Sequence, residues 1–105
     1  MFGLFKKKVD KGAWSEVVYG KRLPHPEQES EERLAALTTG ILMQHHRIII
    51  DSVRIAHTTK SAETRRERIG LCKNHYQEML ALKPFCNKEQ LAIIQNAQDA
   101  MKGTR

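Results

Sequence analysis

The sequence predicts an all-α protein: a long antiparallel helical hairpin, a third C-terminal helix and a short N-terminal helical segment, which together form a small helical bundle. Two observations carry this prediction. Apolar residues recur at spacings of three and four along three segments, which is the period of an amphipathic helix. Helix caps and helix breakers stand at the borders of the same segments. The β-branched stretch "RIIIDSVRIA" resembles a strand, but no other segment offers it a partner.

The chain is expected to divide into a partly flexible N-terminal segment at residues 1–25 and a helical bundle domain at residues 26–105. In the first part, Asp10 is placed to cap a short helix that ends at Gly20. The "LPHP" that follows is a helix breaker, so it marks the link to the bundle.

The first bundle helix is predicted from Pro26 to about residue 57. Proline suits the first position of a helix, and the glutamates that follow suit its positive end. The weakest point is Thr38-Thr39-Gly40, whose low helix propensities together cost about 2 kcal/mol relative to alanine. A kink or break is one expectation there. The predicted core face of this helix consists of Leu34, Leu37, Ile41, His45, Ile48, Ile49, Ser52, Ile55 and Ala56.

Two shorter helices are expected to follow. The second covers about residues 62–82, with Ser61 as its cap and Pro84 as its stop. The third begins after Asn87, has Gln90 at the third position of a capping box, and ends at Gly103. Their predicted core faces are Ile69, Cys72, Tyr76, Met79 and Leu80 in the second helix, and Leu91, Ile94, Ala97 and Met101 in the third.

The net charge of +6 is distributed in blocks along the chain. Residues 1–25 carry +4 (six basic, two acidic), and residues 26–46 carry −3 (one basic, four acidic). Residues 47–75 return to +4 (seven basic, three acidic), and residues 76–105 carry +1 (four basic, three acidic). A basic balance suits acidic partners, but it is also found in ordinary soluble proteins.

The sequence favours a cytoplasmic location. No apolar run approaches the ~18 residues of a membrane-spanning helix. In the opening "MFGLFKKK" the lysines follow a short apolar cluster, which is the reverse of a signal peptide. Two cysteines without an export signal are typical of a reducing compartment.

No catalytic residue, cofactor, metal ligand or small-molecule substrate is predicted, and we expect the protein not to be an enzyme. The chain has no phosphate-binding glycine loop and no nucleophile elbow. Cys72 and His75 share a helix face. The helix end near Lys83 is about 16 Å from Cys72 along the axis, and Cys86 lies just beyond that end, too far away to join them. We therefore interpret Cys72 as a core thiol.

The histidines do not form a recognised metal motif. The chain contains neither H-E-x-x-H nor a Glu-x-x-His pair of the di-iron type. His45 lies on the core face of the first helix, so we interpret it as a structural histidine with its hydrogen bonds satisfied. The other four histidines are expected to be exposed to solvent.

Basic residues gather around the link between the first and second helices. Arg65, Arg66 and Arg68 stand in the first turns of the second helix, where each positive charge opposes the helix dipole by ~0.3–1 kcal/mol. A local rule that is broken without an evident gain can indicate function. The interleaved acidic residues Glu63 and Glu67 favour an ordinary solvated surface instead. The full candidate nucleic-acid or anion patch is Arg47, Arg54, Lys60, Arg65, Arg66 and Arg68.

Several apolar residues lie away from the predicted core faces. They form a candidate self-association surface, Met43, Ile50, Leu71 and Leu82. The leading hypothesis is therefore a non-enzymatic interaction module that acts through a protein partner or a second copy of the chain. The alternative is a nucleic-acid-associated protein that uses the basic patch. A weaker alternative is attachment to a membrane surface through "MFGLFKKK".

Overall fold

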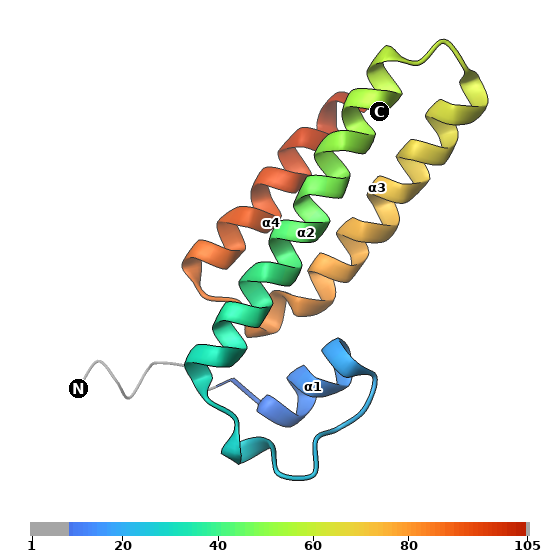
Figure 1. The fold of residues 1–105 in the computed structure, drawn as a ribbon. Coiled ribbons are helices and arrows are strands. Elements are labelled where there is room, and N and C mark those ends of the chain that lie inside the picture. The colour runs from blue at the N-terminus through green and yellow to red at the C-terminus, as the bar shows by residue number, and fades with distance from the viewer. Residues whose placement is uncertain (1–8, 105) are drawn as a thin grey trace.

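A computed structural model describes residues 9–104 and shows an all-α protein, as predicted (Figure 1). Four α-helices follow one another, and the described residues contain no strand. The second helix is the longest and packs against both the third and the fourth, whereas the first lies across one end of the bundle. The helices are α1 (Lys11–Tyr19), α2 (Glu31–Thr58), α3 (Ala62–Leu82) and α4 (Lys88–Met101).

Helix α1 begins and ends where the sequence predicts. The Asp10 side chain accepts a hydrogen bond from the Ala13 amide at 3.0 Å. At the other end, Gly20 adopts a left-handed conformation with φ of 77°, which glycine tolerates because it lacks a Cβ atom.

Helix α2 begins later than predicted. Pro26 opens a short 3₁₀ turn, Pro26–Gln28, and the α-helix starts only after Ser30. The Ser30 hydroxyl accepts from the Arg33 amide at 3.3 Å and so acts as the N-cap. The Ser30 hydroxyl gives a hydrogen-bond acceptor to one backbone amide that would otherwise be unpaired at the start of the helix. A proline side chain offers no such acceptor.

The helix does not break at Thr38-Thr39-Gly40. Thr38 is buried, and its hydroxyl donates to the Leu34 carbonyl at 2.7 Å and accepts from the Trp14 indole at 2.8 Å. The hydrogen bond from Trp14 is a tertiary contact, and it offsets the low helix propensity of the segment. The same contact fastens α1 to α2.

The capping residues of α3 and α4 match the prediction. The Ser61 hydroxyl accepts from the Thr64 amide at 3.1 Å, and Asn87 forms a complete capping box with Gln90. The predicted end at Gly103 is wrong. Helix α4 ends at Met101 and continues as a 3₁₀ turn over Lys102–Thr104, so Gly103 does not terminate it in a left-handed conformation.

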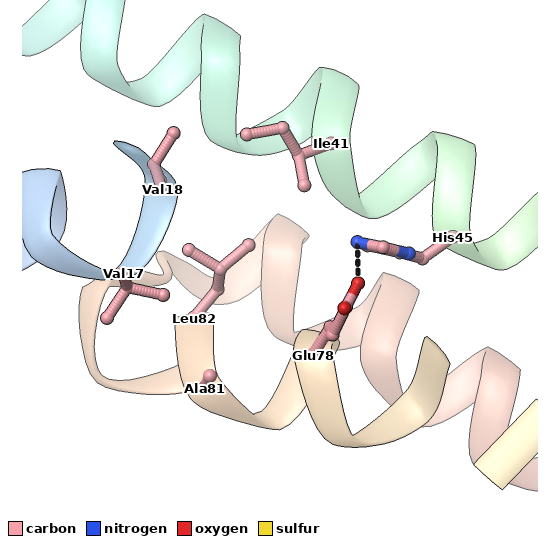
Figure 2. A pocket seen from close by; sticks show the side chains of 7 residues that line it. All are labelled: Val17, Val18, Ile41, His45, Glu78, Ala81 and Leu82. Carbon is pink, nitrogen blue, oxygen red and sulfur yellow. Dashed lines mark ion pairs between the residues drawn. The ribbon is translucent and has the colours of Figure 1, made fainter. Parts of the chain in front are cut away.

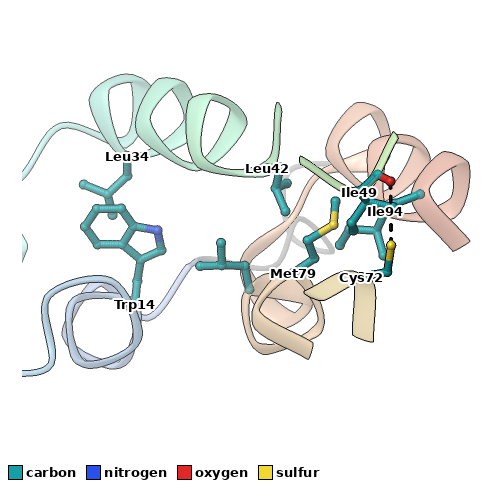
Figure 3. Close-up of a cluster of buried hydrophobic side chains, with 9 residues drawn as sticks. Trp14, Leu34, Leu42, Ile49, Cys72, Met79 and Ile94 are labelled. Atoms are coloured by element: carbon teal, nitrogen blue, oxygen red, sulfur yellow. Dashed lines mark hydrogen bonds between the residues drawn. The ribbon is translucent and has the colours of Figure 1, made fainter. Parts of the chain in front are cut away.

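The core lies between α2 and its neighbours, and α1 contributes Trp14 to it (Figure 3). Two residues of the predicted core faces are wrong, one on α4 and one on α2. Leu91 of α4 is 37% exposed. Leu37 is 36% exposed, whereas Leu42, which was not on the predicted face, is completely buried. The two residues are about 140° apart around the helix. A single apolar face fits one neighbouring helix, but α2 packs against both α3 and α4 and therefore buries a wider part of its surface.

The bundle is flat and elongated, with principal-axis extents of 54 × 31 × 17 Å. Because α2 lies centrally and α3 and α4 contact each other little, one side of α2 remains uncovered. Among the described helices, none combines the length and apolar character that a membrane crossing requires.

Candidate functional site

Two histidines and a glutamate meet between α2 and α3. His45 comes from α2, and His75 and Glu78 stand one turn apart on α3. The Nδ1 atoms of the two imidazoles lie 2.8 Å apart, and His45 Nε2 lies 3.3 Å from Glu78 Oε2. The antiparallel arrangement of the hairpin brings these residues together although thirty positions separate the two histidines. We refer to His45, His75 and Glu78 as the His–His–Glu cluster.

The protons in the cluster are constrained. Only one of the two Nδ1 atoms donates in the contact between the rings, so the histidines hold different proton arrangements. Burial lowers the pKa of His45, the Glu78 carboxylate raises it, and the nearby His75 lowers it further. The net effect is a lowered pKa, which favours the neutral imidazole.

A pocket of about 270 Å³ adjoins the cluster where α1 meets the α2–α3 hairpin. Figure 2 shows His45 and Glu78 at one end of this pocket and aliphatic side chains around the rest. The aliphatic residues are Val17, Val18, Ile41, Ala81 and Leu82. The cluster therefore borders an apolar recess, and Glu78 remains 67% exposed to solvent.

Sequence reasoning missed this cluster. It placed His45 on the core face, but it predicted that His75 would be exposed to solvent, and this is wrong because His75 is half-buried against His45. One signal was present: His75 and Glu78 are three residues apart on a helix and therefore share a face. Nothing in the local sequence shows that this face meets His45.

The cysteines take the positions that the packing pattern indicates. Cys72 is fully buried in the core, and its thiol points to the Ile49 carbonyl at 3.7 Å (Figure 3). Cys86 is half-buried, and its thiol donates to the Leu82 carbonyl at 3.2 Å. Both thiols are free. Burial raises the pKa of both, for Cys86 to about 11.

The basic residues at the α2–α3 link differ in their contacts, and Arg65 is used within the fold. Arg65 turns back toward the end of α2, where its guanidinium donates to the Ala56 carbonyl at 3.2 Å and to the Thr59 carbonyl at 3.4 Å. This contact explains why a positive charge is tolerated at the start of α3: it neutralises the negative end of α2. The other five members of the predicted patch are Arg47, Arg54, Lys60, Arg66 and Arg68. Within residues 9–104, neither these five nor Arg65 forms an ion pair.

The uncovered side of α2 carries an exposed stripe with spacings of four and three. Met43 is 53% exposed and Ile50 is 40% exposed on this stripe. We call it the outer face of α2, and it consists of Ala36, Gly40, Met43, Arg47, Ile50 and Arg54, all exposed.

The predicted self-association surface is only partly retained. Leu71 is 37% exposed, but it belongs to α3 and not to the outer face of α2. The prediction that Leu82 lies on this surface is wrong, because Leu82 is 2% exposed and packs in the core. It faces inward at the last turn of α3, where α1 and α2 also meet.

Comparison with protein-family models, with curated proteins and with solved structures gives no significant match. The predicted membrane contact through "MFGLFKKK" lies outside the described residues.

Proposed function

We propose that the protein is a non-enzymatic interaction module that acts by self-association, with two copies pairing through the outer face of α2. The observation that carries this proposal is the exposure of Met43 and Ile50 on a helix whose other sides are packed. The two residues are seven positions apart, so they lie on one line along the helix. Ala36 and Gly40 extend that line with small residues, which let a second helix approach closely.

The charges on α2 favour an antiparallel pair. The helix starts with Glu31 and Glu32, whereas Arg47 and Arg54 occupy its second half. With a two-fold axis at Met43, the acidic half of one copy lies along the basic half of the other. Such complementarity fixes orientation and speeds association more than it adds affinity.

The spacing of individual residues agrees with this axis. Ile50 and Ala36 are each seven residues from Met43, and Arg54 and Glu32 are each eleven residues from it. Ile50 is therefore expected to pack over Ala36 of the partner subunit. Arg54 is expected to pair with Glu32 of the partner subunit, and the symmetry repeats this pair.

The expected dimer is weak. A 28-residue helix is ~42 Å long, and one helix-to-helix contact of this length buries roughly 1,000 Å², near the lower limit for a specific interface. We expect a dissociation constant in the micromolar range. The two free thiols are consistent with the proposed site of action, the reducing cytoplasm.

Sedimentation equilibrium over a range of protein concentrations tests the dimer. Met43→Glu is expected to give a monomer, because two carboxylates would face each other at the two-fold axis. Gln77→Glu is the matched control: it adds the same charge to an exposed position of α3, and it should leave association unchanged. A parent protein that stays monomeric throughout, or a Met43→Glu variant that associates normally, contradicts the proposal.

A charge exchange tests the orientation. Glu32→Arg and Arg54→Glu are each expected to weaken the dimer, and the double variant should recover it because the pair is restored with its signs reversed. Failure of the double variant to recover excludes the antiparallel register. A monomer that instead binds an oligonucleotide in a salt-dependent manner would favour the nucleic-acid alternative.

A further inference from the structure

The His–His–Glu cluster contains the donor atoms of a transition-metal site. Its three side chains each offer one ligand atom, and these atoms lie within 4.8 Å of one another. Two imidazole nitrogens and one carboxylate oxygen suit Zn²⁺, whereas Mg²⁺ and Ca²⁺ prefer oxygen ligands alone. Three protein ligands are also the number found where zinc keeps a position open for water or another ligand.

The distances are close to those of a tetrahedral ion. With metal–ligand bonds of about 2.0–2.1 Å, adjacent ligand atoms lie roughly 3.4 Å apart. His45 Nε2 and Glu78 Oε2 are already 3.3 Å apart. The two Nδ1 atoms, at 2.8 Å, are held by a proton and not by a metal ion. One imidazole gives an ion only one of its two ring nitrogens, so His45 ligates through Nε2 and its Nδ1 stays outside the coordination sphere. The three ligand atoms of the cluster lie within 4.8 Å of one another, so reaching the tetrahedral spacing requires the His75 ring to move by about 1.4 Å or less.

We propose that His45, His75 and Glu78 bind a divalent transition-metal ion, with Zn²⁺ preferred. The ion fastens α2 to α3, and the recess lined by Val17 and Ile41 lies beside it. Glu78 is exposed enough to admit the ion from solvent. This site does not depend on the proposed self-association, because it lies on the α3-facing side of α2 and not on the outer face.

Metal binding is expected to stabilise the fold. An ion held by residues from two helices binds the folded state and not the separated helices, so the unfolding temperature should rise with the concentration of free Zn²⁺. This readout is independent of any activity. It also distinguishes the cluster from an adventitious surface histidine, which gains nothing from folding.

The test uses the untagged full chain after removal of metal with a chelator. Calorimetric titration with ZnCl₂ should give one ion per chain, and Co²⁺ should give the visible absorption of a tetrahedral site. Glu78→Gln and His75→Ala should each weaken Zn²⁺ binding by at least tenfold, since even an outer-shell change can cost this much. Glu78→Gln changes an exposed side chain of equal size, so the result does not depend on the tolerance of the core.

The matched controls are His46→Ala on α2 and Glu67→Gln on α3. His46 adjoins His45, and Glu67 is an exposed carboxylate of the same helix as Glu78, but neither belongs to the cluster. Both variants should bind Zn²⁺ like the parent. The proposal is overturned if the parent does not bind Zn²⁺ at about 100 µM, or if Glu78→Gln and His75→Ala bind it as the parent does.

Discussion

Helix α2 presents polar groups to both of its neighbours, but the two contacts use them differently. Toward α4, the Gln90 amide donates to the Ala35 carbonyl and to the Thr39 hydroxyl, each at 3.0 Å. The Gln90 carbonyl accepts from the Asn87 amide at 2.8 Å. Both amide protons are therefore used, and no atom of the side chain can ionise.

Toward α3, the polar contact is made by the His–His–Glu cluster. Its two imidazoles share one hydrogen bond between their Nδ1 atoms, and its carboxylate is largely in solvent. The comparison shows that a buried polar side chain whose hydrogen bonds are complete fixes the register of two helices. A cluster that keeps exchangeable protons and lone pairs can instead respond to an added ion.

The largest expected effect concerns the α2–α4 contact. Gln90→Ala should lower the free energy of unfolding by about 2–4 kcal/mol, because it leaves a cavity and removes hydrogen bonds from a 2% exposed side chain. Urea denaturation measures the difference. Gln95→Ala on the exposed side of α4 is the control and should change stability by less than about 0.5 kcal/mol. Equal effects of the two substitutions would contradict the role assigned to Gln90.

The next effect concerns the thiol next to α4. Burial raises the pKa of Cys86 to about 11 from an ordinary value of 9.0, so its thiolate fraction near neutral pH falls by roughly 100-fold. A more basic thiolate is also a stronger nucleophile, which offsets part of this decrease. The alkylation rate of Cys86 is therefore expected to be roughly tenfold lower than that of a solvent-exposed thiol. Mass spectrometry after iodoacetamide treatment of a Cys72→Ala variant measures this rate.

The pH dependence has a defined direction. Because the pKa of Cys86 is raised, its alkylation rate should still be increasing at pH 9, where the rate for an unperturbed thiol begins to level off. A rate that levels off near pH 9 or below would show that the thiol is not shielded as the structure indicates.

A smaller effect is expected at the far end of the α2–α3 contact. Arg65→Ala should lower the free energy of unfolding by about 1 kcal/mol, because it removes two hydrogen bonds to the end of α2. Arg66→Ala, on the neighbouring exposed residue, is the control and should have no measurable effect. Thermal denaturation of both variants provides the measurement. Equal stability of the two variants would show that Arg65 is an ordinary solvated side chain and does not cap α2.

The smallest effect is expected at the cluster itself. In the presence of a chelator, the His45→Leu/His75→Leu double variant should be within about 1 kcal/mol of the parent, since both polar partners are replaced by apolar groups together. Denaturation in urea with chelator present provides the measurement. A loss well above that value would mean that the histidines maintain the fold as Gln90 does, and the contrast between the two contacts would disappear.

The features predicted from sequence are those that depend on neighbours along the chain. Asp10, Ser61 and the Asn87–Gln90 pair signal helix starts through hydrogen bonds that span three residues, and all are confirmed. The all-α fold follows from the same signals together with apolar periodicity.

Apart from the helix start at Pro26 and the helix end at Gly103, the features that were missed depend on contacts between helices. Leu42 was left out of the core because one periodic face cannot show that α2 has neighbours on two sides. The His45–His75 contact requires the register of the hairpin, which no local pattern supplies. Arg65 was recognised as unfavourable in its own helix, but the carbonyls that it caps belong to α2.

The contact between Trp14 of α1 and Thr38 of α2 makes tryptophan fluorescence a probe of the docking of α1. Trp14 is the single tryptophan of the sequence, is 1% exposed, and lies edge-on to Tyr19 with ring centroids 5.6 Å apart. Its fluorescence therefore reports whether α1 is docked, whereas far-ultraviolet circular dichroism is dominated by the three longer helices. Unfolding followed by both signals separates the release of the N-terminal helix from the melting of the bundle.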